Sequence, residues 1–277
     1  MIPALRQPCQ RLLATHRRGG RVVLLFDYDG TLVPIVEHPR LAVLPPENRR
    51  VLADLARVPR VHLGIISGRQ LADLRRIVDL PGIYFAGTSG LELDFDGVQV
   101  MHPSSGEIVP LLRQLSDGLG GLAGEFPGAW LEHKPLGLTV HFRKVRTSLT
   151  GGLRERVTEI VSSFSGRFRL VESSLSLEIT PDLGWTKGTA VRMLVDSVRA
   201  PDVRVLYAGD SANDDEAMVA VADDGGITVG VGAEAPAAAN VRVRDPGDLF
   251  EFLAAFAEAL SACRVSHSLR PGGAVTL

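Results

Sequence analysis

The stretch Phe26-Asp27-Tyr28-Asp29-Gly30-Thr31-Leu32 ends the apolar run Val22–Phe26 and places two carboxylates two residues apart just beyond it. A short, uninterrupted apolar run is typical of a strand that is buried on both faces of a parallel sheet. In open α/β folds, ligands bind at the carboxyl ends of such strands. We therefore predict that Asp27 and Asp29 lie in a functional site.

Four further apolar runs alternate with stretches of helical periodicity. They are Val61–Ile66, Ile83–Ala86, Val203–Ala208 and Ile227–Val231. Strands that alternate with helices in this way predict a doubly wound parallel sheet with helices on both faces. The runs Leu91–Phe95 and Val98–Met101 flank Asp96-Gly97, a pair that favours a tight hairpin turn. The fold class that follows is α/β.

The middle of the chain has a different pattern. Four segments alternate polar and apolar residues, and the helix-like stretches Glu107–Ala123 and Ser148–Phe164 stand apart from them. The four are Trp130–Lys134, Leu138–Lys144, Arg167–Glu172 and Leu175–Ile179. This pattern predicts an antiparallel sheet with one open face. We therefore divide the chain into an N-terminal extension (1–20), a catalytic core (21–104 and 184–262), an inserted α+β cap (105–183) and a C-terminal tail (263–277), with both ends loosely held.

Composition excludes several classes of protein. The 277 residues include 30 basic and 32 acidic side chains, so the net charge of -2 offers no field for nucleic acid or anionic lipid. No apolar run approaches the roughly 20 residues of a membrane helix, and no signal-peptide pattern opens the chain. Two cysteines are too few for a disulfide framework or a cysteine metal site. We expect a cytoplasmic protein with a small-molecule substrate and no nucleic-acid or membrane partner.

The two aspartates suit phosphoryl transfer. Asp27 can act as a nucleophile that takes up a phosphoryl group, and Asp29 as the general acid and base that protonates the leaving oxygen and then activates water. Gly30 lets the chain pass close to a phosphate, and the Thr31 hydroxyl can donate a hydrogen bond to it. An ordinary acidic loop with an Asp-Gly turn is the alternative explanation.

Two more strand ends carry groups that suit a phosphate. Ser67-Gly68-Arg69 follows the second apolar run, where a hydroxyl and backbone amides at a helix start favour an anion. Lys187 precedes a helical stretch and can neutralise phosphoryl oxygens while keeping Asp27 ionised. Considered alone, Ser67 has a simpler explanation as a helix cap and Lys187 as a surface lysine.

A third strand end is acidic. Gly209-Asp210-Ser211-Ala212-Asn213-Asp214-Asp215 follows the run Val203–Ala208. Oxygen ligands suit Mg²⁺, and Asp27, the carbonyl of Asp29, Asp210 and Asp214 are the candidate metal site. A helix N-terminus rich in aspartate is the alternative. All four elements fall at strand ends in sequence, which favours one joint site.

This set of motifs (D-x-D-G-T, S-G-R, K-G and G-D-x-x-x-D) resembles the haloacid dehalogenase superfamily. Within it, the chain is similar to the trehalose-6-phosphate phosphatase family over about residues 21–262. The phrases that carry this similarity are Asp27–Leu32 with Pro34-Ile35, Leu131-Glu132-His133-Lys134, His141-Phe142-Arg143 and Glu178-Ile179-Thr180-Pro181. The resemblance implies a dehalogenase-like core with a cap, Mg²⁺-dependent hydrolysis of trehalose 6-phosphate, and a functional link to trehalose-6-phosphate synthase.

Strand parity selects candidate sugar-binding residues in the cap. Alternation places Leu138, Val140 and Phe142 on one face, and likewise Leu175, Leu177 and Ile179. The opposite, open face then carries Glu132, Lys134, His141, Arg143 and Glu178, with Arg69 at the rim below. The family resemblance implies that this face closes over Asp27 as a cap. A solvated sheet face with salt bridges is the alternative. We expect His16, His38, His62, His102 and His267 to be structural or surface residues.

Three functions remain open on the sequence. The first is a phosphatase of trehalose 6-phosphate. The second is a phosphatase with the same chemistry on another glycosyl phosphate, such as a glucosyl or mannosyl glycerate phosphate. Ser89, where the family tends to have histidine, and the Ser211/Asn213 form of the acidic loop depart toward this second function. The third is a signalling receiver whose aspartate only stores phosphate, although receivers need neither a second carboxylate nor a cap.

Overall fold

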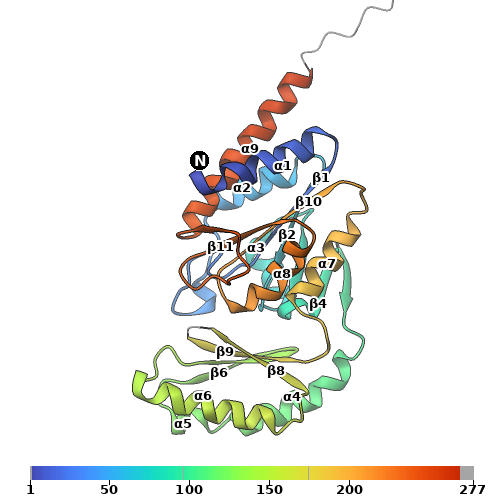
Figure 1. Ribbon diagram of the computed structural model, residues 1–277. Helices are drawn as coiled ribbons and strands as arrows, with labels where there is room; N and C mark the ends of the chain where they lie inside the picture. Colours follow the sequence, from blue (N-terminus) through green and yellow to red (C-terminus); the bar gives the residue numbers. More distant parts are fainter. Residues whose placement is uncertain (1, 96, 174, 269–277) are drawn as a thin grey trace, which may run out of the picture.

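A computed structural model describes residues 2–95, 97–173 and 175–268. It has a large sheet with helices on both faces and, facing the edge of that sheet, a smaller sheet with helices on its far side only (Figure 1). None of the described helices is both long and apolar enough to cross a membrane.

The large sheet has the strand order β12-β11-β10-β1-β2-β3-β4-β5. All pairs from β12 to β3 are parallel, and β4 and β5 are added antiparallel at one end. The strands are β1 (Arg21–Phe26), β2 (Val61–Ile66), β3 (Tyr84–Gly87), β4 (Glu92–Phe95), β5 (Val98–Met101), β10 (Val203–Gly209), β11 (Ile227–Val231) and β12 (Val241–Val243). The predicted α/β fold class is confirmed.

The central strand β1 shows why its sequence is uniformly apolar. Leu24 and Phe26 face one side of the sheet, where they pack under α1 (Arg6–Arg17), α2 (Pro46–Ala56), α3 (Leu71–Val78) and α9 (Pro246–Ser268). Val23 and Leu25 face the other side and pack under α7 (Lys187–Ser197) and α8 (Asp215–Asp223). Because both faces are covered, every strand position but the first is fully buried.

The prediction that residues 1–20 are loosely held is wrong. Leu5 and Leu12 are fully buried and Cys9 almost so, all within the cluster that includes Leu24 and Phe26. Their spacing of three and four residues is an apolar helix stripe that packs on the sheet. At the other end, α9 continues beyond residue 262 to Ser268, and residues 269–277 of the predicted tail lie outside the described chain. Asp96 of the predicted hairpin is also outside it, although β4 and β5 pair as a hairpin requires.

The small sheet forms a cap between Ser105 and Pro181. Its order is β6-β7-β9-β8, with every pair antiparallel. The strands are β6 (Trp130–Lys134), β7 (Gly137–His141), β8 (Phe168–Ser173) and β9 (Ser176–Pro181), and the helices on the far face are α4 (Ser105–Leu119), α5 (Leu122–Glu125) and α6 (Thr147–Ser162). The cap has its own apolar core, built from the helices and the inward strand residues.

Strand parity in the cap is correct at most positions. Leu138, Val140, Leu177 and Ile179 are buried in the cap core as the alternation requires. Leu175 is not: it is 37 % exposed. It precedes β9, which begins at Ser176, so the strand alternation does not extend to it.

Candidate active site

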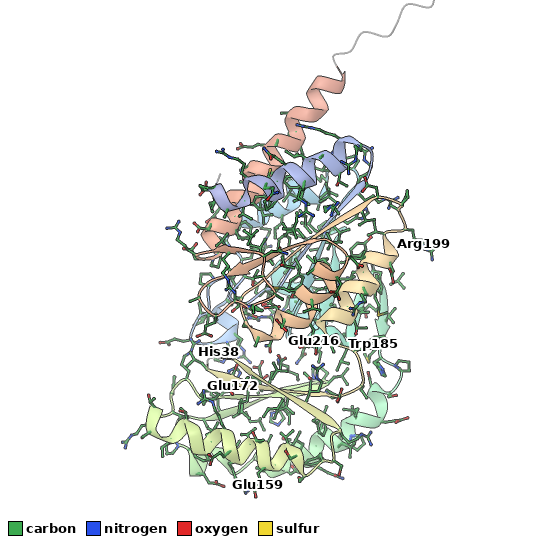
Figure 2. All side chains as sticks on the ribbon, in the orientation of Figure 1. His38, Glu159, Glu172, Trp185, Arg199 and Glu216 are labelled. Carbon is green, nitrogen blue, oxygen red and sulfur yellow. The ribbon has the colours of Figure 1, made fainter. Side chains whose placement is uncertain are left out.

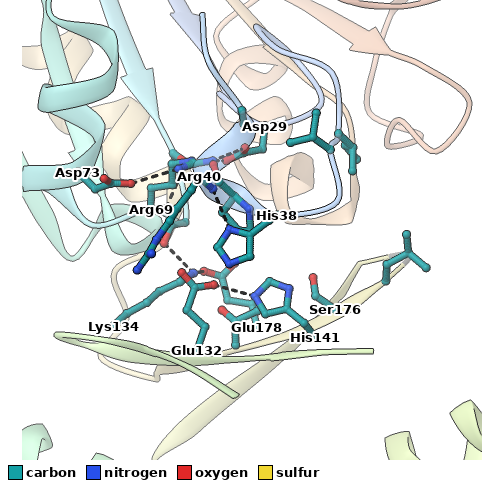
Figure 3. A pocket seen from close by; sticks show the side chains of 18 of the residues that line it. Asp29, His38, Arg40, Arg69, Asp73, Glu132, Lys134, His141, Ser176 and Glu178 are labelled. Atoms are coloured by element: carbon teal, nitrogen blue, oxygen red, sulfur yellow. Dashed lines mark hydrogen bonds and ion pairs between the residues drawn. The ribbon is translucent and has the colours of Figure 1, made fainter. Parts of the chain in front are cut away.

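A cavity of about 950 Å³ lies between the carboxyl ends of the core strands and the open face of the cap sheet. Figure 3 shows its two sides, with Asp29, Arg69 and Asp73 on the core side and Glu132, Lys134, His141 and Glu178 on the cap side. Of the predicted site residues, those that line it are Asp27, Asp29, Ser67, Gly68, Arg69, Glu132, Lys134, His141, Arg143, Glu178, Lys187 and Asp210. Thr31 and Asp214 are not among them.

A buried charge cluster lies at the core end of the cavity. The Lys187 ammonium donates to Asp27 Oδ1 at 2.9 Å and to Asp214 Oδ1 at 2.8 Å. Asp27 comes from the end of β1, and Lys187 is the first residue of α7, whose start is capped by the Thr186 hydroxyl. Lys187 is thus no surface lysine: the fold inserts its ammonium between two carboxylates.

Asp214 acts as the organiser of this cluster. Its Oδ1 also accepts from the Tyr207 hydroxyl at 2.6 Å, and its Oδ2 accepts from the backbone amides of Asp210 and Ser211 at 3.0 and 3.2 Å. With both oxygens engaged, Asp214 holds the loop after β10 in place. Tyr207 was not among the residues predicted for the site, although the hydroxyl of a tyrosine buried in a strand usually needs a hydrogen-bond partner.

The cluster has three carboxyl groups and one ammonium. Asp27, Asp210 and Asp214 each offer an oxygen, and these three atoms lie within 4.8 Å of one another. Burial raises the pKa of Asp27 to about 7 against the lowering effect of Lys187. Burial, with the neighbouring carboxylates of Asp27 and Asp214, raises the pKa of Asp210 to about 9. A buried carboxylate set with one ammonium suits a hard cation with oxygen ligands.

Asp29 is turned toward a different partner. Arg69 donates from Nε to Asp29 Oδ2 at 2.6 Å and from Nη2 to Asp29 Oδ1 at 2.7 Å. The Asp29 carboxylate is outside the oxygen cluster of Asp27, Asp210 and Asp214. The metal role predicted for Asp29 was assigned to its backbone carbonyl, and it stays a prediction.

The remaining core residues are placed as follows. Ser67 is buried just after β2, and its hydroxyl accepts from the Arg69 amide at 3.2 Å; it does not cap α3, whose N-cap residue is Gln70. A Cβ at Gly68 would lie 2.4 Å from Glu178 Oε1, so a side chain there would displace the Glu178 carboxylate. Thr31 is fully buried outside the cavity, and its hydroxyl has no hydrogen-bond partner within the described chain. Its predicted phosphate contact stays a prediction.

On the cap side, two glutamates are each paired with a basic side chain. Glu132 Oε2 lies 2.7 Å from His141 Nε2, and Lys134 Nζ donates to Glu178 Oε1 at 2.9 Å. Burial alone would raise the pKa of both glutamates. Lys134 outweighs burial at Glu178, and His141 together with Lys134 does so at Glu132, so both pKa values lie below their usual range.

Several contacts join the cap to the core around the cavity, among them a hydrogen bond from Asn213 Nδ2 to Glu178 Oε2 at 3.4 Å. Lys134 also donates to the Gly68 carbonyl at 2.9 Å, and Arg169 of β8 pairs with Glu216 of α8. At the rim, the ring of His38 stacks on that of Trp130, with centroids 5.5 Å apart. Figure 2 shows His38 and Glu216 on the core side, facing the cap sheet. The cap is therefore closed on the core.

His38 was assigned only a structural or surface role from the sequence. It lies on the loop between β1 and α2, is exposed, and lines the cavity mouth. Trp130 stacks in turn on His141, its partner across the β6–β7 pair, with centroids 4.0 Å apart. An isolated histidine in a loop gives no sequence signal for such a contact, because Trp130 is almost a hundred positions away.

The chain matches known proteins along most of its length. The family model described as trehalose-phosphatase matches residues 25–245. A probable trehalose-phosphate phosphatase D of Arabidopsis thaliana is 31 % identical over 258 residues, which cover 87 % of this chain and 68 % of the relative. The chain spans about half the length of the matching mycobacterial trehalose-phosphate phosphatases, 52 % in Mycobacterium tuberculosis at 34 % identity.

Solved structures show the same fold. The C-terminal domain of C. albicans trehalose-6-phosphate phosphatase superposes with a TM-score of 0.81 at 22 % identity, covering 93 % of this chain and 98 % of that one. A haloacid dehalogenase-like hydrolase of Bacteroides thetaiotaomicron superposes with a TM-score of 0.59 at 16 % identity, covering 88 % and 99 %. With a capped dehalogenase-like fold and a family match over four-fifths of its length, the chain belongs to the trehalose-phosphatase family.

Proposed function

We propose that this protein is a Mg²⁺-dependent phosphatase that hydrolyses trehalose 6-phosphate to trehalose and phosphate through an aspartyl-phosphate intermediate. The observation that carries the proposal is the buried Asp27–Lys187–Asp214 cluster, which faces a cap surface of paired polar groups across one cavity. The family match supplies the substrate, and the composition favours a cytoplasmic location. In this proposal the substrate is the product of trehalose-6-phosphate synthase, which makes that enzyme a functional partner.

Asp27 has the position of a nucleophile. Lys187 holds its Oδ1, so attack on phosphorus falls to Oδ2. The new bond joins Asp27 Oδ2 to phosphorus while the bond from phosphorus to the sugar oxygen breaks, and Asp29 gives its proton to that oxygen. Asp29 then takes a proton from water, the water oxygen attacks phosphorus, and Asp27 is released with phosphate.

The carboxylates of Asp27 and Asp210 fit Mg²⁺, with Asp214 fixing both through Lys187 and the loop backbone. When bound, the ion would offset the negative charge that builds up on the phosphoryl oxygens. Lys187 supports this from the protein side, since it is buried beside the nucleophile and its pKa is raised by Asp214 and Asp27 beyond the lowering effect of burial.

The cap is the proposed reader of the sugar. Glu132, Lys134, His141 and Glu178 line the cavity with donors and acceptors for hydroxyl groups, and Arg143 joins them just past the end of β7. A site built to hydrogen-bond hydroxyl groups rejects ligands that leave its groups unpaired. A disaccharide phosphate fills this face, whereas a single ring leaves much of it without a partner.

Phosphate release from a panel of sugar phosphates tests the proposal. Purified protein with Mg²⁺ is given trehalose 6-phosphate, glucose 6-phosphate, and glucosyl and mannosyl glycerate phosphates. We expect the highest kcat/KM for trehalose 6-phosphate, by a wide margin over glucose 6-phosphate. A preference for a glycosyl glycerate phosphate would replace the substrate but keep the chemistry. Stable phosphate on Asp27 without turnover would overturn the phosphatase itself.

A further inference from the structure

Arg69 was expected to contact substrate, but its guanidinium is occupied by the protein. Besides the two bonds to Asp29, Arg69 donates from Nη1 to Asp73 Oδ2 at 3.1 Å and from Nη2 to the Pro39 carbonyl at 2.7 Å. Four of the five N–H donors that a guanidinium carries are thus engaged. The side chain is only 9 % exposed, and its Cζ lies 5.2 Å from the centre of the Tyr28 ring. A substrate that contacts Arg69 through more than one N–H would therefore break existing bonds.

The bonds to Asp29 have the geometry that best fixes a carboxylate. Two parallel N–H···O contacts of 2.6 and 2.7 Å make a bidentate pair, which sets the rotamer of both partners. Asp29 follows β1 and is 40 % exposed, so little else surrounds its side chain. The orientation of Asp29 therefore depends on Arg69.

Arg69 is itself anchored on two further elements. Asp73 lies in the first turn of α3, and Pro39 opens the short helix η2 (Pro39–Leu41) in the loop at the cavity mouth. The same loop is held by Tyr28, whose hydroxyl donates to the Ala42 carbonyl at 3.0 Å. One guanidinium thus links Asp29, helix α3 and the loop that holds Pro39 and Ala42, which we call the rim loop (Figure 3).

We infer that Arg69 is a positioning residue: it orients Asp29 for proton transfer and ties that orientation to the rim loop, instead of binding the sugar phosphate. This inference rests on the proposed acid–base role of Asp29. For Asp29 to give a proton to the leaving oxygen, one of the two contacts with Arg69 must open, while the other keeps the carboxyl group in place.

The test compares Arg69→Met, Asp29→Asn and the double variant. Methionine keeps an unbranched apolar stem against Tyr28 but has no donors. If Arg69 acts through Asp29, Arg69→Met lowers kcat on trehalose 6-phosphate at least about 10-fold, up to the 10²–10⁴-fold range of general acid–base catalysis, and leaves KM within about 2-fold. The double variant is then no slower than Asp29→Asn, since coupled residues are not additive.

An aryl phosphate gives a second readout that does not depend on the sugar. Its phenolate leaves without a proton, so only the later attack of water needs Asp29. We expect p-nitrophenyl phosphate to give a burst of about one phenolate per enzyme with Arg69→Met and Asp29→Asn, followed by slow turnover. Arg57→Met, which removes an exposed arginine that pairs with Asp54, is the matched control and should give wild-type kinetics.

Several outcomes would overturn the inference. One is a raised KM for the sugar phosphate with unchanged kcat in Arg69→Met, which would make Arg69 a substrate contact. Another is a multiplicative loss in the double variant. If Arg69→Met does not fold, Arg69→Lys carries the test, because an ammonium cannot form the bidentate pair and should show the same burst; wild-type kinetics in that variant would contradict the inference. If Asp29→Asn alone is fully active, the proposed mechanism fails, which is a separate result.

Discussion

The two sides of the cavity differ in how their charges are balanced. On the core side, Asp27, Asp210 and Asp214 face one ammonium, that of Lys187, and the pKa values of Asp27 and Asp210 are raised. On the cap side, each glutamate has a basic partner of its own, and the pKa values of both glutamates are lowered. The core side has three carboxyl groups around one ammonium, whereas on the cap side each of the two glutamates is paired with a basic side chain.

This difference indicates two modes of ligand binding. The core side gains from adding a cation, because buried like charges are costly until they are compensated. At the paired residues of the cap side a ligand binds by exchange, since a sugar hydroxyl must replace or share bonds that Glu132, His141, Lys134 and Glu178 already make with one another. Under the proposed function, chemistry therefore depends on the core side and discrimination among sugars on the cap side.

The largest effect on the core side is expected from Asp27→Asn. An amide cannot form the aspartyl phosphate, so turnover should fall by more than about 10⁴-fold on every substrate, as loss of a nucleophile does elsewhere. Because the change removes one buried negative charge, metal-free stability at pH 8 should not fall. Phosphate release and thermal unfolding measure both effects, with the exposed Asp54→Asn as control. Retained phosphatase activity in Asp27→Asn would contradict the role of Asp27.

The second prediction concerns stability and pH in the presence of a chelator. The pKa of Asp210 is about 9 in the folded protein, against an ordinary 3.8 in the unfolded chain, so its contribution to stability is complete below about pH 4 and is lost as pH rises toward 9. Metal-free wild type should therefore lose stability relative to Asp210→Asn across this range, by at most about 1.4 kcal/mol per pH unit.

Mg²⁺ should reverse that loss, because binding at 100 times Kd adds about 2.7 kcal/mol. It should also restore activity that the chelator removes. Denaturant unfolding at several pH values, with and without Mg²⁺, measures the effect, and Asp210→Asn serves as the variant that Mg²⁺ stabilises less. A wild type whose stability and activity ignore both chelator and Mg²⁺ would exclude a metal at this cluster.

On the cap side, Glu132→Ala and Arg143→Ala should act on sugar phosphates alone. A hydrogen bond from a sugar hydroxyl to a charged group such as the Glu132 carboxylate is worth about 1.5–3 kcal/mol, so its loss should lower kcat/KM roughly 10- to 150-fold. Hydrolysis of p-nitrophenyl phosphate should change little. The ratio of kcat/KM on the two substrates is the measurement, and Glu172→Ala on β8, exposed and paired with Arg154, is the control. Equal losses on both substrates would indicate a structural role.

The sequence predicted the core side well because its chemistry follows from topology. Parallel strands end at one edge of the sheet, so residues after β1, β2 and β10 had to meet, and Asp27, Ser67 and Asp210 line one cavity. The hydrogen-bond partner of each side chain could not be predicted from this topology. Arg69 turns to Asp29 and Thr31 is buried, and these choices depend on residues from other elements that no local pattern contains.

The smallest predicted effect concerns Thr139, a buried polar residue of the cap face. It lies opposite Glu132 on one side and Glu178 on the other, and it lines the cavity. It is 4 % exposed, and within the described chain its hydroxyl has no hydrogen-bond partner. A buried hydroxyl without a partner is costly, so this position is ready for a sugar hydroxyl with no bond to exchange.

Thr139→Val keeps the branched shape and removes the hydroxyl. We expect unfolding stability to stay the same or rise by up to about 1 kcal/mol, because no intramolecular hydrogen bond is lost. Activity on trehalose 6-phosphate should fall about 2- to 10-fold in kcat/KM, the value of one neutral hydrogen bond, with p-nitrophenyl phosphate unaffected. Thr180→Val, a buried position on β9 outside the cavity lining, is the control. Unchanged selectivity would show that the cap binds sugar only by exchange of its charged pairs, and a loss of stability would show that the Thr139 hydroxyl has a partner in the folded protein.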